Sequence, residues 1–246
     1  MPRKTDRAVE IQRKYYTQTA DRYDSMHANE GATDIALMNY LCGFFRMFQV
    51  RSVLDVGSAT GRGACFVQEA MPDAFVCGVE PVAALATKAR QDALTPRLSI
   101  VRASGESLPF PDSSFDAVYE ISVLHHVANP DAVVQEMLRI ARKAVFVCDS
   151  NRFGQGSFPS RVLKLLLYKI NLWPIYIHLR TRGKRYSITE GDGLSYSYSI
   201  YDSYELLANW ADRIFLLPAA PGKANSWFHP LLTSSAVILC AVRERT

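Results

Sequence analysis

A short apolar run that ends in a glycine turn is the first feature of this chain with chemical potential. Residues 53–57 are typical of a buried strand, and Gly57 and Gly61 bracket the turn into a helical stretch. Glycine lets the backbone pass close to a ligand, and the free N–H groups of a helix N-terminus favour an anionic group. Ligands of open α/β sheets bind beyond the carboxyl ends of the strands, so we expect a nucleotide-like ligand beside Asp55.

Glu80 narrows the choice of ligand. It ends the next apolar run, 23 positions after Gly57, where a carboxylate can accept hydrogen bonds from both ribose hydroxyls of an adenosine. The dinucleotide fingerprint GxGxxG is not met, because Ala59 and Arg62 stand at its later glycine positions. A GxxxxGK(S/T) phosphate loop is also absent from the sequence. We therefore expect an adenosine without a pyrophosphate.

Three residues around the end of a later apolar run are candidate acid–base groups. His125 and His126 follow an expected strand at 115–121, and a neutral imidazole suits proton transfer near pH 7. Glu120 lies one residue before the end of that strand, and alternation predicts that it shares a face with Ser122. The alternative for the histidines is that they only support the loop after the strand.

Aromatic and acidic residues further along are candidates for binding a second molecule. Tyr196, Tyr198 and Tyr201 offer ring faces to sugars or flat scaffolds and hydroxyls to polar edges. Asp192, in the glycine-rich run 189–193, could bind substrate hydroxyls, although such a run is equally typical of a solvent-facing turn. The His and Cys spacings match no metal motif, so we expect no metal site.

The elements that must position these residues alternate between strands and helices. The expected strands are 52–56, 75–80, 98–102, 115–121 and 144–148, and the expected helices are 61–70, 81–92 and 130–140. Apolar strands separated by helices imply a parallel sheet covered on both faces, so we predict a doubly wound α/β fold. A single apolar helix is expected at 162–173. A helix at 203–211 and strands at 213–217 and 235–242 would close the sheet with an antiparallel pair.

Four motifs, in order and at the expected intervals, resemble the small-molecule branch of the class I S-adenosylmethionine (SAM)-dependent methyltransferases, the "type 11" methyltransferase domain. They are VLDVGSATG at 53–61, GVEP at 78–81, ASGESLPF at 103–110 and the stretch from FDAV to LHHV at 115–127. The resemblance implies SAM as the cofactor. It also implies a mostly parallel, seven-stranded Rossmann-like sheet with an N-terminal helical lid and an insertion after strand five.

The resemblance further implies how individual residues meet SAM. Asp55 and Gly57 would border its methionine part, Glu80 would hold its ribose, Glu106 with Ser104 and Gly105 would flank its adenine, and Ile121 would lie near its sulfonium. Further expected cofactor contacts are Ser58, Ala59, Gly61 and Pro81. Tyr23 would close over the cofactor, unless its segment is a plain amphipathic helix on the sheet edge. Ala59 replaces a family glycine, which is tolerable if its φ stays negative. Ser104 replaces the aspartate usual beside the adenine amino group.

We expect one domain over residues 1–246, with lid helices at 1–50, the SAM-binding core at 51–150, an acceptor-binding insertion at 151–200 and closing elements at 201–246. The net charge is +4, yet residues 151–189 hold 8 basic and no acidic residues. Segment 161–185 could cap the acceptor pocket, contact a second copy in a homodimer, or lie on a membrane surface against anionic lipid.

Composition bounds the function classes. Hydrophobic residues make up 48% and charged residues 21% of the chain, as in an ordinary globular protein. Five cysteines without a CxxC pair, and no apolar leader or spanning run, predict a cytoplasmic protein that could also be membrane-peripheral. A nucleic-acid partner is not expected, because the basic cluster is short and residues 120–123 lack the Pro-Pro-aromatic motif of base-flipping relatives.

The sequence therefore predicts methyl transfer from SAM to a hydroxyl of a small metabolite, a sugar or polysaccharide precursor, a natural product or a lipid-linked acceptor, with an amine as the second choice. Two alternatives stay open. One is a SAM-binding partner subunit without catalysis, and the other is a nicotinamide-dependent oxidoreductase.

Overall fold

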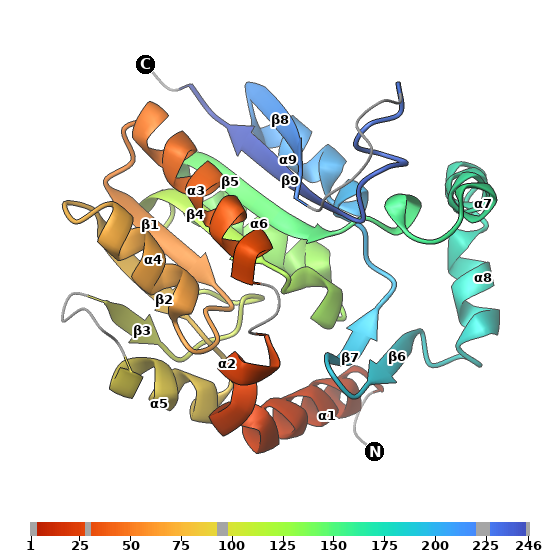
Figure 1. Cartoon of the computed structure of the whole chain (residues 1–246), viewed down its shortest axis with the longest axis horizontal. Helices are drawn as coiled ribbons and strands as arrows, with labels where there is room; N and C mark the ends of the chain where they lie inside the picture. The colour runs from red at the N-terminus through yellow and green to blue at the C-terminus, as the bar shows by residue number, and fades with distance from the viewer. Residues whose placement is uncertain (1–3, 28–30, 93–97, 220–226, 245–246) are drawn as a thin grey trace.

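Most positions of five strands are buried, because both faces of their sheet are covered by helices. A computed structural model describes residues 4–27, 31–92, 98–219 and 227–244 (Figure 1). Its main sheet has seven strands in the order β3-β2-β1-β4-β5-β9-β8. They are β1 (Ser52–Val56), β2 (Phe75–Val79), β3 (Ser99–Val101), β4 (Phe115–Ile121), β5 (Ala141–Ser150), β8 (Arg213–Pro218) and β9 (Ala236–Val242).

The strand directions confirm the predicted fold class. Strands β1 to β5 pair in parallel, and β9 pairs antiparallel with both β5 and β8. The result is the expected doubly wound, mostly parallel, seven-stranded α/β sheet. The parts of the predicted lid and closing segments at 1–3, 28–30, 220–226 and 245–246 lie outside the described residues.

Neighbouring residues of one strand pack on opposite faces of the sheet, as the two-residue period requires. Val53 belongs to a core formed with α3 (Gly31–Met47) and α4 (Arg62–Ala70). Leu54 belongs to the core on the other face, formed with α6 (Pro130–Ile140) and α9 (Tyr204–Trp210). Helix α5 (Ala83–Asp92) covers the β3 edge through Ala86 and Ala89. This double layer holds the carboxyl ends of the parallel strands in fixed positions.

The insertion after β5 differs from the prediction of one helix at 162–173. The structure has two helices, α7 (Phe158–Lys169) and α8 (Trp173–Arg180). Asn171 between them adopts φ +58°, a left-handed conformation that ends a right-handed helix, and Pro174 lies in the first turn of α8, where its missing N–H costs nothing. Both helices lie at the edge of the molecule, away from the main sheet (Figure 1).

A separate hairpin of β6 (Tyr186–Thr189) and β7 (Gly193–Tyr196) packs beside the N-terminal helix α1 (Lys4–Thr19), as Figure 1 shows. The Leu194 N–H donates to Gln12 Oε1 over 2.6 Å, and the Tyr15 hydroxyl donates to the Glu190 carbonyl over 2.5 Å. Gly193 has φ +72°, and a Cβ there would lie 2.8 Å from the Tyr15 ring. The hairpin and α1 therefore form one wall over the strand ends.

Candidate active site

A cavity of about 930 Å³ lies at the carboxyl ends of β1, β2 and β4. Four parts of the chain line it: the N-terminal helices, the turn after β1, the loops after β2, β3 and β4, and the hairpin turn at 191–192. The volume lies near the upper end of the range for small-molecule sites, so it can hold a cofactor together with a second small molecule.

The turn after β1 brings the backbone close to this cavity. The N–H groups of Gly57 and Ser58 donate to the Val79 carbonyl over 2.8 and 3.0 Å. Gly57 has φ +82°, and a Cβ there would lie 2.4 Å from a methyl group of Val123. Ala59 has φ +48°, so the negative φ under which alanine would be tolerated here is not met, and this residue carries backbone strain. Gly61, at φ +81°, caps α4 and is not part of the cavity lining.

Glu80 follows β2 directly and faces the cavity from a buried position. Its two carboxylate oxygens accept the Ala59 N–H over 3.0 Å and the Val82 N–H over 2.7 Å. Burial raises the pKa of Glu80 to about 7. Burial, with a smaller contribution from the charge of Glu80, also raises the pKa of Asp55 to about 7. The remaining lone pairs of Glu80 are free to accept two ribose hydroxyls.

The other predicted cofactor residues line the same cavity, namely Tyr23, Ser58, Pro81, Ser104, Gly105, Glu106 and Ile121. Gly105 sits so close to Val56 and Val133 that a Cβ would meet each at 3.1 Å, which leaves its backbone facing the hollow. The lid is tied to the cofactor turn, because the Thr60 hydroxyl donates to Asp24 over 2.6 Å. The structure thus gathers residues from the four predicted motifs and from the N-terminal segment around one space.

The two histidines line the same cavity from the loop after β4. Ser122 adopts φ +58°, which ends β4 and starts the single turn η3 (Leu124–His126). Fully buried Leu124 anchors that turn, and the ring centroids of His125 and His126 lie 4.0 Å apart. His125 Nδ1 lies 2.8 Å from Asp149 Oδ1, and the His125 backbone N–H donates to the other Asp149 oxygen over 3.1 Å.

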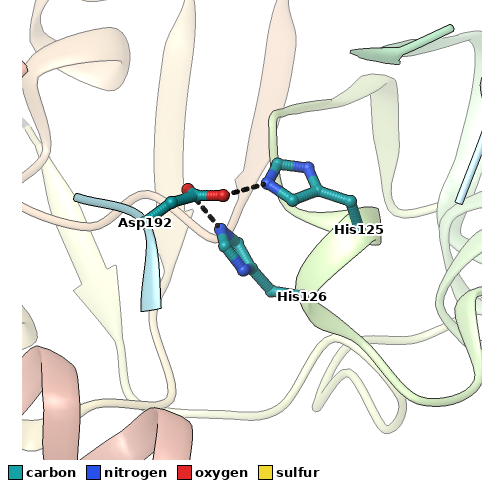
Figure 2. A group of neighbouring side chains, drawn as sticks. All are labelled: His125, His126 and Asp192. Atoms are coloured by element: carbon teal, nitrogen blue, oxygen red, sulfur yellow. Dashed lines mark ion pairs between the residues drawn. The ribbon is translucent and has the colours of Figure 1, made fainter. Parts of the chain in front are cut away.

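Asp192 reaches this pair from the hairpin turn (Figure 2). Its carboxylate oxygens lie 3.6 Å from His125 Nε2 and 3.3 Å from His126 Nε2, and these two rings hold the pKa of Asp192 well below its usual range. Burial alone would lower the pKa of His125, but Asp149 and Asp192 raise it to about 10. With its proton retained at neutral pH, His125 is not a free base in this state.

Besides Gly61, four predicted residues fall outside the cavity lining. Glu120 is fully buried and accepts the N–H groups of Val123 (2.9 Å) and Cys148 (3.0 Å), so the structure does not support it as an acid–base group. The positive φ of Ser122 also breaks the alternation that placed both side chains on one face. Tyr198 is a core residue whose hydroxyl pairs with Ser203 over 2.8 Å.

The other two tyrosines are also placed elsewhere. Tyr201 packs on Phe153, with ring centroids 6.0 Å apart. Tyr196 packs on Tyr186 and lines a separate hollow of about 430 Å³ between the hairpin and the basic segment after α8. The prediction that three tyrosines line the acceptor pocket therefore fails, because η5 (Ile200–Asp202) turns Tyr198 and Tyr201 back into the core.

Several residues at the site were missed from the sequence. The Tyr16 hydroxyl lies 3.0 Å from His126 Nε2, and Gln12 and Asp149 support the hairpin and His125. Only Asp149 carried a readable signal, as a carboxylate at the end of an apolar run. The structure also gathers His125, His126 and Asp192 so that one potential ligand atom from each lies within 4.8 Å of the others. Motif spacing could not reveal this group, because Asp192 lies in a distant hairpin.

The sequence of the strands and loops around the cavity is similar to that of known methyltransferases. Residues 54–148 match the family model described as a methyltransferase domain. An uncharacterized methyltransferase of Mycolicibacterium gilvum is 30% identical over 164 residues, covering 60% of this chain and 61% of the relative. One from Mycobacterium sp. strain KMS is 31% identical over 173 residues, covering 68% of this chain and 65% of the relative. The chain thus spans about three fifths of the length of such curated relatives.

The fold has close counterparts among solved structures. Magnesium protoporphyrin IX methyltransferase from Synechocystis PCC 6803, solved with bound SAH, aligns at a TM-score of 0.63 and 15% identity, covering 96% of this chain and 100% of that chain. That likeness concerns the fold, while the family match concerns the sequence of the cofactor-binding core. By sequence, residues 54–148 are thus a SAM-dependent methyltransferase domain, and this stretch carries the motifs around the cavity.

Proposed function

We propose that this protein transfers the methyl group of SAM to a hydroxyl group of a small acceptor. The observation that carries the proposal is that two groups of residues with different chemistry line one cavity. One wall holds Asp55, Glu80 and the glycine turn, and the other holds the pair His125 and His126 with Asp192. Methyl transfer is an in-line displacement, which requires a donor and an acceptor aligned in one space that excludes water.

In this proposal the first wall binds SAM. Glu80 accepts the ribose hydroxyls, the backbone at Gly105 flanks the adenine, and buried Asp55 faces the positively charged methionine end. Tyr23 and Tyr16 of the N-terminal segment cover the cofactor, and the bond from Thr60 to Asp24 keeps that cover closed. The methyl group then faces Ile121 and the histidines beyond it.

The second wall binds the acceptor. A cluster of two imidazole rings and a carboxylate offers several polar atoms that can hold and polarise a hydroxyl group. This chemistry favours a hydroxyl over an amine, which at neutral pH would add a positive charge beside protonated His125.

A SAM-dependent mass-spectrometry screen of a metabolite extract tests the proposal. The expected result is a product heavier by one methyl group, formed together with S-adenosylhomocysteine, and lost in Glu80→Ala. Tight SAM binding without turnover on any acceptor would instead support a SAM-binding partner subunit. Binding of a nicotinamide dinucleotide in place of SAM would support the oxidoreductase alternative.

The acceptor class is suggested by the surface of α7 and α8. Large apolar side chains on these helices are exposed, including Phe158 (58%), Leu166 (56%) and Leu179 (72%). Exposed basic residues follow directly, at Arg180, Arg182, Lys184 and Arg185. Among the described residues no helix is long and apolar enough to cross a bilayer. Apolar side chains beside cations are typical of helices that lie on an anionic membrane surface.

We further propose that this surface binds anionic lipid and brings the enzyme to a lipid-linked acceptor. The protein should sediment with phosphatidylglycerol-containing vesicles and not with pure phosphatidylcholine vesicles. Leu166→Glu should weaken this binding by at least about tenfold, since a charge replaces an apolar contact with the bilayer. Met47→Glu, at an equally exposed apolar position on α3, is the matched control and should change nothing. Unaltered sedimentation in Leu166→Glu, or a stable dimer held together by this face, would contradict the proposal.

A further inference from the structure

The cluster of His125, His126 and Asp192 has the construction of a metal site as well as that of an ion pair. Both histidines come from the single turn η3, and Asp192 comes from the hairpin turn across the cavity. Figure 2 shows the three side chains pointing toward one another. All three line the cavity, so a group bound between them would face the space proposed for the acceptor.

The second nitrogen of each ring is oriented as in metal-binding histidines. His125 Nδ1 lies 2.8 Å from the buried carboxylate of Asp149. His126 Nδ1 lies 2.7 Å from the Leu194 carbonyl oxygen and 3.1 Å from the Gln12 amide nitrogen; the shorter contact, to the carbonyl, is a hydrogen bond when Nδ1 carries the proton and donates it. In both rings Nδ1 is thus committed to a hydrogen bond and Nε2 faces the cavity. A carboxylate or carbonyl behind the ring is the usual support of a histidine that binds a metal through its other nitrogen.

The separations of the ligand atoms fit a small ion. Two ligand atoms that each lie about 2.1 Å from a tetrahedral ion are about 3.4 Å apart. Asp192 Oδ2 lies 3.6 Å from His125 Nε2, and Asp192 Oδ1 lies 3.3 Å from His126 Nε2, so each ring has one oxygen of the same carboxylate near this spacing. The full set lies within 4.8 Å, so small ring rotations are enough to bring the third pair to the same spacing.

Charge balance points to a divalent ion. Asp149 and Asp192 are the two carboxylates in contact with the histidine pair. Their two negative charges balance one divalent cation when both rings are neutral. Imidazole ligands favour zinc and similar transition ions over magnesium or calcium, whose preferred ligands are oxygens.

We infer that His125, His126 and Asp192 bind a divalent transition-metal ion such as Zn²⁺ at the acceptor end of the cavity. Three protein ligands leave at least one coordination position open, as in catalytic rather than structural sites. That position faces the cavity, so the ion would hold the acceptor oxygen, a role that rests on the proposed function. The Tyr16 hydroxyl, which lies 3.0 Å from His126 Nε2, gives up this contact when the ion binds.

Titration of chelator-treated protein with Zn²⁺ by calorimetry tests the binding site without any need for turnover. Co²⁺ adds a spectroscopic readout, because its visible absorption reports imidazole and carboxylate ligation. We expect one equivalent of either ion to bind in the wild type. Asp192→Asn and His126→Asn each remove one ligand and should lower the affinity by more than about 100-fold, beyond the loss typical of a supporting residue. Tyr16→Phe should not lower it, since the phenyl ring leaves His126 Nε2 free.

Two matched variants separate the site from nearby groups. Glu190→Gln changes an acid in the same hairpin turn, and His178→Asn changes a histidine on α8, so both should bind the ion as the wild type does. Asp192 is half-buried in a hairpin turn outside the hydrophobic core, and its variant should stay folded, which its melting temperature checks. Absence of one-equivalent binding, or equal losses in Asp192→Asn and Glu190→Gln, would overturn the inference and leave an ion pair.

The same protein samples distinguish this inference from the proposed function. If the wild type transfers methyl groups but binds no Zn²⁺, the metal site is refuted and the methyltransferase proposal stands. If the wild type binds one equivalent of Zn²⁺ but no SAM, the metal site stands and the methyltransferase proposal is refuted.

Discussion

Replacing Glu80 by Gln tests the cofactor site with the smallest change of shape. The carboxylate receives two backbone N–H groups, from Ala59 and Val82. Whichever way the amide turns, its NH₂ group must face one of these donors, and it offers one oxygen where the carboxylate offers two. The variant should therefore lose at least one hydrogen bond to the ribose of SAM, together with the negative charge that strengthens the other.

The size of the loss follows from the kind of bond. A hydrogen bond to a charged group contributes about 1.5–3 kcal/mol, which corresponds to about 10- to 150-fold in the dissociation constant of SAM. Burial raises the pKa of Glu80 to about 7, so the loss must depend on pH. The ionised carboxylate is the better acceptor, and its fraction falls from about 0.9 at pH 8 to about 0.1 at pH 6. The advantage of the wild type over the variant should shrink about tenfold across that range.

Calorimetric titration with SAM at pH 6, 7 and 8 measures both effects. The ratio of the two dissociation constants cancels the titration of the ligand, which is common to both proteins, and leaves the effect of Glu80 together with its influence on the pKa of Asp55. Thermal unfolding of each sample checks that the variant is folded. A ratio near one at pH 8, or a ratio that stays constant between pH 6 and pH 8, would refute the assignment of Glu80 to the ribose.

Three further substitutions test the turn and the lid. Gly57→Ala should destabilise the protein by about 2–5 kcal/mol, from positive φ and from overlap with Val123, and denaturant unfolding would show it. Ala59→Gly should raise stability by up to about 1 kcal/mol, because glycine accepts φ +48° without strain; a destabilised variant would contradict this. Asp24→Ala removes the acceptor of the Thr60 hydroxyl, so dissociation of SAM should become about tenfold faster in stopped-flow measurements, and an unchanged rate would show that this bond does not hold the lid.

The sheet and its cofactor end could be predicted because their signals are local. The strand at 52–56 was recognisable as an apolar run of the right length before a glycine turn, and the structure gives the same limits. Gly57 and Glu80 were identified from their places at strand ends, which in a parallel sheet lie at one edge. Ala59 shows the limit of such reasoning, since its residue type favours negative φ, yet the turn holds it at +48°.

The acceptor end could not be predicted in the same way. Tyr198 and Asp192 stand six residues apart in a polar, aromatic stretch, and nothing local distinguishes their surroundings. The turn η5 buries Tyr198, whereas the hairpin carries Asp192 to the histidines. Glu120 also looked accessible at a strand end, but the backbone N–H groups of Val123 and Cys148 enclose it.

The sequence by itself thus determined the order of strands and helices, the glycine turn and the carboxylate that follows β2, because these depend on apolar periodicity and on residues close together in the chain. Only the tertiary structure decided what faces the acceptor. His126 meets Asp192 and Tyr16 across 66 and 110 positions of chain. Contacts over such separations arise from the packing of the hairpin against α1, and that packing, rather than any local pattern, assembles the second wall of the cavity.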